Sequence, residues 1–393
     1  MFFQSTFFLL LISFFSLNTS CSAGDLLTKN SEISTPEISA DENDSENDTH
    51  PFQVNPALTV IYGTHGAKGD RRPSMEDTHY PPNAHISQLG ELGSLIADGI
   101  HFFGLYDGHG GKGAAEYAQA RLHRILVETE SFHAGNYMNA LTDAYQKTHE
   151  EYIADQRNNA GTTAVTILFA GPELWVANAG DSEAVLYFEN QAARCITQIH
   201  SPADKNECIR IMRLPNSAVR IFRQQNTTTY QSVVKDNGEL LLYKEDTRTP
   251  KNHQEALTYN FLDRYSLNGD EKYIQKFHIT GKIILQDSSY LAVSRGLGDK
   301  RYVPFVTPIP FVQNLQLDQP GFLILGCDGL WDVMSYQAAV NFVIREMNLK
   351  NLTLQTITHD DAEEIAAKLV YKALEICDHD NVTATLIFFT PKL

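Results

Sequence analysis

Five places in this sequence carry acidic residues that could bind metal ions, and four of them follow or precede an apolar, strand-like run: Glu76 with Asp77, Asp107 with Gly108, Asp181, Asp328 with Asp332, and Asp380. Strands are stiff and their loops converge at one edge of a sheet, so carboxylates there can be held close together. Magnesium and manganese take oxygen ligands. Two such cations bridged by a carboxylate supply what hydrolysis of a phosphomonoester requires. One Asp-Gly pair alone is more often an ordinary turn, so the prediction depends on the whole set.

Hydrophobic periodicity indicates the elements that must position these residues. Strand-like runs cover residues 59–63, 101–106, 163–169, 174–179, 183–188, 322–327 and 382–389. Apolar residues recur at helical spacing in residues 113–130, 137–152, 337–347 and 362–376. Strand blocks interrupted by helix pairs predict an α+β fold, in which antiparallel sheets are covered by helices.

Composition and charge narrow the class of protein. The chain has 393 residues, of which 42% are hydrophobic, so a sizeable buried core is expected. The formal net charge of −17 argues against a nucleic-acid partner, because a surface that neutralises phosphates needs clustered Lys and Arg. No Cys-x-x-Cys pair occurs, so we expect neither a zinc site nor a full disulfide framework. A Cys195–Cys208 bridge stays open as an alternative to the favoured buried free thiols.

The N-terminal residues differ in composition from the rest of the chain. Residues 7–15 form an apolar run with the length of a signal-peptide core, although no Lys or Arg precedes it. We predict a signal or anchor segment at residues 1–22 and an acidic disordered linker at residues 23–54. If the run acts as a signal, the protein is secreted or membrane-anchored, with membrane contact through this segment alone. Otherwise we expect it to be cytoplasmic.

Seven motifs stand in order over about 320 residues: RPSMED (72–77), FGLYDGHGG (103–111), GTTA (161–164), ANAGDS (177–182), LAVSRGLGD (291–299), CDGLWDV (327–333) and DNVT (380–383). The series resembles the PPM family, the type-2C class of metal-dependent protein serine/threonine phosphatases. The resemblance implies a four-layer α/β/β/α sandwich, with two antiparallel sheets flanked by helix pairs, in residues 55–393. This agrees with the element order predicted from the periodicity.

The resemblance also implies a binuclear magnesium or manganese centre. Asp107 matches the carboxylate that bridges both ions, and Gly108 matches a backbone-carbonyl ligand. Asp328 and Asp380 match ligands of one ion, and Glu76 and Asp77 match ligands that act directly or through metal-bound water. Asp181 and Asp332, with Asp328, match a third and weaker metal site that some members of the family form.

Two further residues are implied to act on the substrate. Arg72 resembles a phosphate-binding arginine, since a guanidinium can hold two phosphoryl oxygens at once. His109 resembles the general acid that protonates the departing serine or threonine oxygen, and an imidazole titrates in the range this task needs. Together these features predict hydrolysis of phosphoserine and phosphothreonine in proteins by a metal-bridging hydroxide, with a monomeric enzyme. Arg295 and Asp299 are expected to be architectural, pinning an insert to the core by an ion pair.

The sequence departs from the family pattern at one place. About 90 residues separate His200 from the LAVSRGLGD motif, so we predict an enlarged flap or insert at about residues 200–289. It is either a lid beside the site or a peripheral, loop-rich embellishment. Two other functions stay open: a catalytically inactive binding module, and a metallohydrolase that acts on a small phosphorylated molecule or a nucleotide. The inactive binding module is disfavoured because no predicted core ligand is lost, and the ordered motifs disfavour the small-molecule metallohydrolase.

Overall fold

The computed structural model describes residues 58–82, 99–155, 159–216, 219–223, 228–234, 240–244, 279–285 and 289–391. The predicted signal or anchor segment and the acidic linker lie outside these residues. None of the helices in the described ranges is long and apolar enough to cross a membrane.

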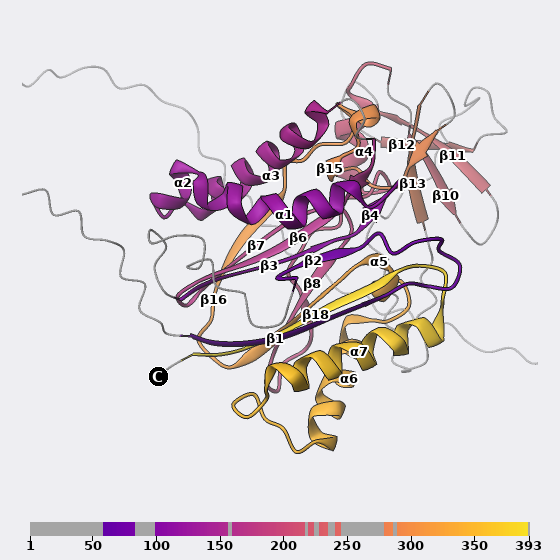
Figure 1. Cartoon of the computed structure of the whole chain (residues 1–393). Coiled ribbons are helices and arrows are strands. Elements are labelled where there is room, and N and C mark those ends of the chain that lie inside the picture. Colours follow the sequence, from indigo (N-terminus) through magenta and orange to yellow (C-terminus); the bar gives the residue numbers. More distant parts are fainter. Residues whose placement is uncertain are drawn as a thin grey trace, which may run out of the picture. The chain divides into compact units, whose positions relative to one another are not determined.

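Two antiparallel sheets of five strands form the centre of the described structure (Figure 1). The first has the order β1 (Leu58–Ala67), β18 (Val382–Pro391), β17 (Gly321–Gly326), β8 (Glu183–Phe188), β9 (Arg194–Cys195). The second has the order β16 (Phe311–Gln316), β7 (Glu173–Ala179), β6 (Ala164–Ala170), β3 (Ile100–Tyr106), β2 (Thr78–Tyr80). Each predicted strand is found within a few residues of its expected bounds, whereas β2, β9 and β16 were not predicted.

Alternate residues of the central strands face opposite layers. In β6, Val165, Ile167 and Phe169 belong to the core between the two sheets. Ala164 and Leu168 of the same strand belong to the core beneath the helices. Because side chains alternate along a strand, a strand buried on both faces has a continuous apolar sequence, as β6 does.

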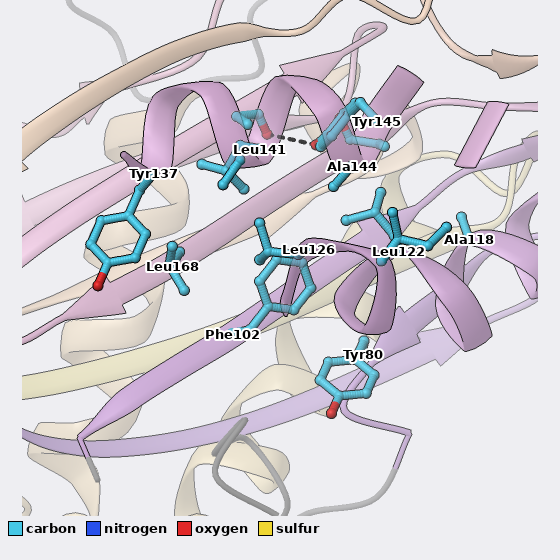
Figure 2. Close-up of a cluster of buried hydrophobic side chains, with 14 of the residues drawn as sticks. Tyr80, Phe102, Ala118, Leu122, Leu126, Tyr137, Leu141, Ala144, Tyr145 and Leu168 are labelled. Atoms are coloured by element: carbon cyan, nitrogen blue, oxygen red, sulfur yellow. Dashed lines mark hydrogen bonds between the residues drawn. The ribbon is translucent and has the colours of Figure 1, made fainter. Parts of the chain in front are cut away.

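Two pairs of long helices cover the outer faces of the sheets. Helices α1 (Gly113–Glu128) and α3 (Tyr137–Ala154), with the short α2 (Glu130–His133) between them, pack on the second sheet, and α6 (Tyr336–Leu349) and α7 (His359–Ile376) pack on the first. Figure 2 shows Leu122 and Leu126 of α1 beside Phe102 of β3. The order helix, sheet, sheet, helix confirms the predicted α/β/β/α sandwich.

A small third sheet lies next to the second. Its order is β15 (Leu297–Gly298), β5 (Gly161–Thr162), β4 (Gly108–His109). It joins three of the motifs recognised in the sequence, because each of its strands comes from a different motif. The 3₁₀ helix η3 (Lys300–Tyr302) follows β15, and the single-turn helix α5 (Asp328–Trp331) follows β17.

The segment predicted as an insert carries regular structure in its described part. Helix α4 (Lys205–Met212) is followed by a sheet of order β12 (Leu240–Lys244), β11 (Thr228–Val234), β10 (Val219–Arg223), β13 (Ile279–Ile284), β14 (Tyr290–Leu291). The described part of this segment is therefore not loop-rich, since strand pairing satisfies its backbone groups. That the segment is a lid beside the site or a peripheral embellishment stays a prediction. These strands were not predicted, because their mixed polar and apolar residues give no clear hydrophobic periodicity.

None of the cysteines in the described ranges forms a disulfide bond: Cys195, Cys208, Cys327 and Cys377. The alternative of a Cys195–Cys208 bridge is therefore not realised. Cys208 and Cys327 are buried as predicted, whereas Cys195 and Cys377 are half-buried.

Candidate metal centre

The pairing register of the strands brings the loops that carry the predicted acidic ligands to one edge of the two central sheets. Leu105 pairs with Val165 and Ala164 pairs with Ala179, so β3 ends where β6 begins and β7 ends. In the other sheet, Gly326 pairs with both Glu183 and Ala384, so β17 ends where β8 and β18 begin. The turn at residues 180–182 joins the two sheets at this edge. The loops that carry the predicted ligands therefore meet here.

Asp107 leaves the end of the fully buried strand β3, and the GTTA motif fixes its backbone. Its carbonyl oxygen accepts hydrogen bonds from the backbone N–H of Thr163 (2.9 Å) and the hydroxyl of Thr162 (3.0 Å). The hydroxyl of Thr163 also accepts from the Asp107 N–H (3.4 Å). Thr162 and Thr163 thus hold the main chain of the residue predicted to bridge two metals.

Asp77 lies beside Asp107 because their strands pair. Thr78 of β2 is opposite Tyr106 of β3. This pairing places Asp77, which precedes Thr78, next to Asp107, which follows Tyr106. One oxygen of Asp77 accepts from the hydroxyl of Thr383 at 2.7 Å. The other, Oδ1, is buried and has no hydrogen-bond partner among the described residues. An unpartnered buried carboxylate oxygen is costly unless a cation binds it.

Glu76 and Gly108 lie in direct contact through their backbones. A Cβ atom at position 108 would come within 2.4 Å of the Glu76 carbonyl oxygen, so a residue larger than glycine would push the two loops apart. The Glu76 side chain is half-buried, and its Oε1 accepts from the Ser74 hydroxyl at 3.2 Å. Its charge also acts on His109. The structure therefore places Glu76 at the border of the cluster.

The remaining carboxylates come from the sheet that contains β17 and β18. Asp328 begins α5, and its carbonyl oxygen accepts from the Asp332 N–H at 2.7 Å. Asp380 precedes β18 and accepts from the N–H of Asn381 at 2.8 Å. Asp181 lies in the turn between β7 and β8. Asp332 is exposed, whereas Asp328 and Asp181 are half-buried.

The carboxylates raise one another's pKa. Burial, together with the charges of Asp77 and Asp328, holds the pKa of Asp107 well above its usual range. The pKa of Asp328 is also held well above its usual range, by burial and by the charges of Asp181 and Asp332. Burial raises the pKa of Asp77 to about 6, against the opposing hydrogen bond from Thr383. Such a concentration of like charge fits divalent cations, which restore the ionised forms of all of these groups.

Cys327 lies among these carboxylates. Its sulfur and ligand oxygens of Asp77 and Asp107 lie within 4.8 Å of one another. Burial and the neighbouring Asp77 and Asp107 raise the pKa of the thiol well above its usual value, so it stays protonated. The sulfur also accepts from the N–H of Thr383 at 3.3 Å. Since a neutral thiol is a poor ligand for hard cations, the oxygens and not this sulfur are the candidate ligands.

Arg72 and His109 lie at the border of the acidic edge. The guanidinium of Arg72 is 42% exposed and donates to Asp380. Its pKa is raised because the bond and charge of Asp380 outweigh the effect of burial. His109 follows Gly108, and its Nε2 lies 2.8 Å from Oδ1 of Asp299. From the sequence, Asp299 was expected to be architectural and not part of the site.

The structure thus brings together the eight predicted acidic and glycine positions, Arg72 and His109, while their roles stay predictions. Three neighbours were not predicted: Thr383, Cys327 and Asp299. All three lie inside recognised motifs, so motif membership was the available signal. Arg295, also expected to be architectural, pairs with Glu207 of α4 at 2.6 Å, as an ion pair that pins the insert would.

The four layers and the acidic edge define a class of protein, a sandwich of two antiparallel sheets with a carboxylate metal centre. A family model described as "Protein phosphatase 2C" matches residues 63–230 and 266–382, which is more than half of the chain. These ranges contain every carboxylate of the cluster, Arg72 and His109. The chain belongs to the protein phosphatase 2C family.

Named relatives agree with this assignment. Protein spalten of Dictyostelium discoideum is 28% identical over 329 residues, which cover 82% of this chain and 27% of that protein. "Probable protein phosphatase 2C 11" of Arabidopsis thaliana is 28% identical over 331 residues, which cover 84% of this chain and 66% of that protein. This chain therefore spans less than two thirds of the length of either relative.

A solved structure shares the fold. The serine-threonine phosphatase 2C from Toxoplasma gondii aligns with a TM-score of 0.58 at 20% identity, over 84% of this chain and 95% of that chain. The gap between the two ranges of the family match, residues 231–265, falls inside the segment predicted as an insert.

Proposed function

We propose that this chain is a metal-dependent phosphatase that removes phosphate from phosphoserine and phosphothreonine in proteins. The observation that carries the proposal is the acidic edge, where a buried oxygen of Asp77 lacks a partner and Asp107 is surrounded by like charges. Family membership supports the same activity. The substrates are phosphorylated proteins, and the enzyme acts as a monomer.

The oxygens at this edge suit two Mg²⁺ or Mn²⁺ ions. Asp107 and the carbonyl of Gly108, with Asp77, Glu76, Asp328 and Asp380, are the groups that would hold them. Asp181 and Asp332, with Asp328, would hold a third ion. When bound, such ions activate water and neutralise charge on the phosphoryl group.

The chain's own residues act on the substrate around that centre. Arg72, which is 42% exposed at the border of the acidic edge, holds phosphoryl oxygens through its guanidinium group. His109 donates a proton to the departing serine or threonine oxygen, which would otherwise leave as an unstable alkoxide. Neither step needs a cysteine nucleophile, and Cys327 stays a buried neutral thiol.

Release of phosphate from a phosphothreonine peptide tests this function. The full chain is assayed with Mn²⁺, with Mg²⁺ and with chelator, beside Asp107→Ala and the control Asp318→Ala. Asp318 is exposed and lies before the start of β17, at the end of that strand opposite to Asp328. We expect activity that requires metal, falls more than about 100-fold in Asp107→Ala and is unchanged in the control. No turnover of phosphopeptides, with turnover of nucleotides, would favour the small-molecule alternative.

We also propose that residues 1–22 direct export or anchoring of the chain. The apolar run at residues 7–15 motivates this, because it has the length of a signal-peptide core. We expect the mature chain in intact cells to begin near residues 20–24. N-terminal sequencing of soluble protein that found Met1 or Phe2 would rule the proposal out and place the enzyme in the cytoplasm.

A further inference from the structure

Asp299 is a buried carboxylate that contacts the predicted general acid. Its side chain is 3% exposed, and its Oδ1 lies 2.8 Å from Nε2 of His109. Its second oxygen, Oδ2, is buried and has no hydrogen-bond partner in the part of the chain that the structure describes. A buried carboxylate with one polar side-chain partner is costly, so its retention beside His109 calls for an explanation.

The backbone around Asp299 is held on both sides. Its N–H donates to the carbonyl oxygen of Ala160 (3.2 Å), and its own carbonyl oxygen accepts from Tyr302 N–H (2.7 Å). The residue has a φ of 51°, in the left-handed region that non-glycine residues seldom occupy. Fixing a side chain in this way is typical of groups that orient a neighbour.

The GTTA motif makes room for this carboxylate. Gly298 pairs with Gly161 in the small sheet, directly before Asp299. A Cβ atom at position 161 would lie 2.2 Å from Oδ1 of Asp299. The absence of a side chain at Gly161 therefore allows Asp299 to reach His109, which lies opposite Gly161 in β4.

We propose that Asp299 is a positioning residue for His109: it accepts the Nε2–H of the imidazole and fixes the ring so that Nδ1 carries the proton that is donated. Nδ1 has no hydrogen-bond partner among the described residues, and the His109 side chain is 27% exposed. The inference rests on the proposed phosphatase function. An aspartate that fixes the tautomer and orientation of a histidine is an established catalytic device.

Proton transfer from His109 accompanies the displacement at phosphorus. The oxygen of hydroxide forms a bond to phosphorus while the bond from phosphorus to the serine or threonine oxygen breaks. The electron pair of that bond stays on the departing oxygen, which takes the proton from Nδ1 of His109. The products are inorganic phosphate, the free hydroxyl group and a neutral imidazole whose Nε2–H still donates to Asp299.

The dependence of kcat on the leaving group of the substrate distinguishes a positioning role of Asp299 from a structural one. For Asp299→Asn we expect kcat on a phosphothreonine peptide to fall about 100-fold, with KM within about threefold, because an amide can adopt the wrong hydrogen-bonding orientation. On p-nitrophenyl phosphate we expect a loss below about threefold, because nitrophenolate departs without a proton. His109→Ala should show the same pattern, and adding Asp299→Asn to it should cause no further loss. Asp318→Asn is the surface control.

The same series contains the results that would overturn the proposal. Equal losses on both substrates, or additive losses in the double variant, would give Asp299 a structural role only. The ring ¹⁵N NMR signal of His109 gives a direct readout, and it is assigned as the signal that disappears in His109→Ala. We expect this signal to shift in Asp299→Asn. An unchanged signal would also overturn the proposal. A wild-type chain inactive on both substrates would overturn the proposed function itself, whereas an active wild type matched by Asp299→Asn would overturn only the role of Asp299.

Discussion

At the scale of single residues, Asp77 and Asp107 are held by neighbours that carry no charge. Thr383 donates to Asp77, and Thr162 and Thr163 bind the main chain of Asp107. The hydroxyls of Thr383 and Thr162 each donate to one oxygen, whereas the hydroxyl of Thr163 accepts from the Asp107 N–H. These short side chains leave other oxygens open, whereas a longer side chain would fill the space that a cation needs.

Gly161→Ala tests the space requirement beside Asp299. The new methyl group would lie 2.2 Å from a carboxylate oxygen that cannot retreat into solvent, because the side chain is 3% exposed. We expect the contact with His109 to be lost and kcat on a phosphothreonine peptide to fall 10- to 100-fold. Steady-state kinetics measure this. In a His109→Ala background the substitution should cost little more, and an equally large further loss there would contradict the explanation.

At the scale of elements, an ion cluster ties α4 to the loop that leads to Asp299. Glu207 of α4 is buried and binds Arg295 at 2.6 Å and Arg210 at 2.9 Å. Arg210 also donates to the carbonyl oxygens of Ser294 (2.8 Å) and Phe305 (3.0 Å). The first helix of the insert is therefore fixed to residues 294–305 by charge-assisted bonds as well as by apolar packing.

Glu207→Gln should destabilise the protein because it leaves two arginines without their carboxylate. Burial acts to raise the pKa of Glu207, but Arg295 and Arg210 outweigh it and hold the pKa at about 2. Since the folded pKa is depressed, the stabilisation is present above the unfolded pKa and is lost as pH falls from about 4.5 to about 2. We expect the free energy of unfolding at pH 7 to decrease by about 3 kcal/mol.

Urea denaturation of Glu207→Gln at pH 7 measures this effect. The matched control is Glu364→Gln, because Glu364 pairs with Lys350 and Lys368 while 48% exposed. Water screens the charges of exposed side chains, so the control should be close to wild type. Equal effects of the two substitutions would show that the cluster at α4 behaves as an ordinary surface pair.

At the scale of the whole molecule, the layers bury several neutral histidines. Burial lowers the pKa of His101 and of His123 to about 4 and that of His200 to about 3. Below pH 6.5 the unfolded chain takes up these protons and the folded chain does not. Each residue therefore decreases the free energy of unfolding by about 2 kcal/mol between pH 7 and pH 5.

His123→Phe tests the acid sensitivity. His123 stacks on Tyr80 at 4.0 Å between ring centroids, so a phenyl ring can keep the contact. We expect the decrease in stability from pH 7 to pH 5 to be about 2 kcal/mol smaller than in wild type. Because the site carboxylates also titrate, the quantity compared is the difference between variant and wild type in urea denaturation. Identical decreases in the two proteins would show that His123 does not titrate on unfolding.

Most strands of the two central sheets and the helices that cover them were predictable from the sequence alone. The strands predicted at residues 163–169 and 183–188 are β6 and β8 of the structure, and the helices predicted at residues 137–152 and 362–376 are α3 and α7. These features are set by side-chain periodicity within one segment. The acidic residues were found for a related reason, because four of the five acidic places follow or precede an apolar run. Motif resemblance then supplied their roles as predictions.

Which distant residues meet depends on the tertiary packing of the chain. His109 and Asp299 are 190 positions apart, and Arg295 and Glu207 are 88 apart. The strand β16 also escaped prediction, because its half-exposed edge position against β7 gives it no continuous apolar run. The physical reason is common to these cases. Periodicity reports what one segment does along its own axis, whereas contacts between segments depend on register and layer order, which the packing of the whole chain sets.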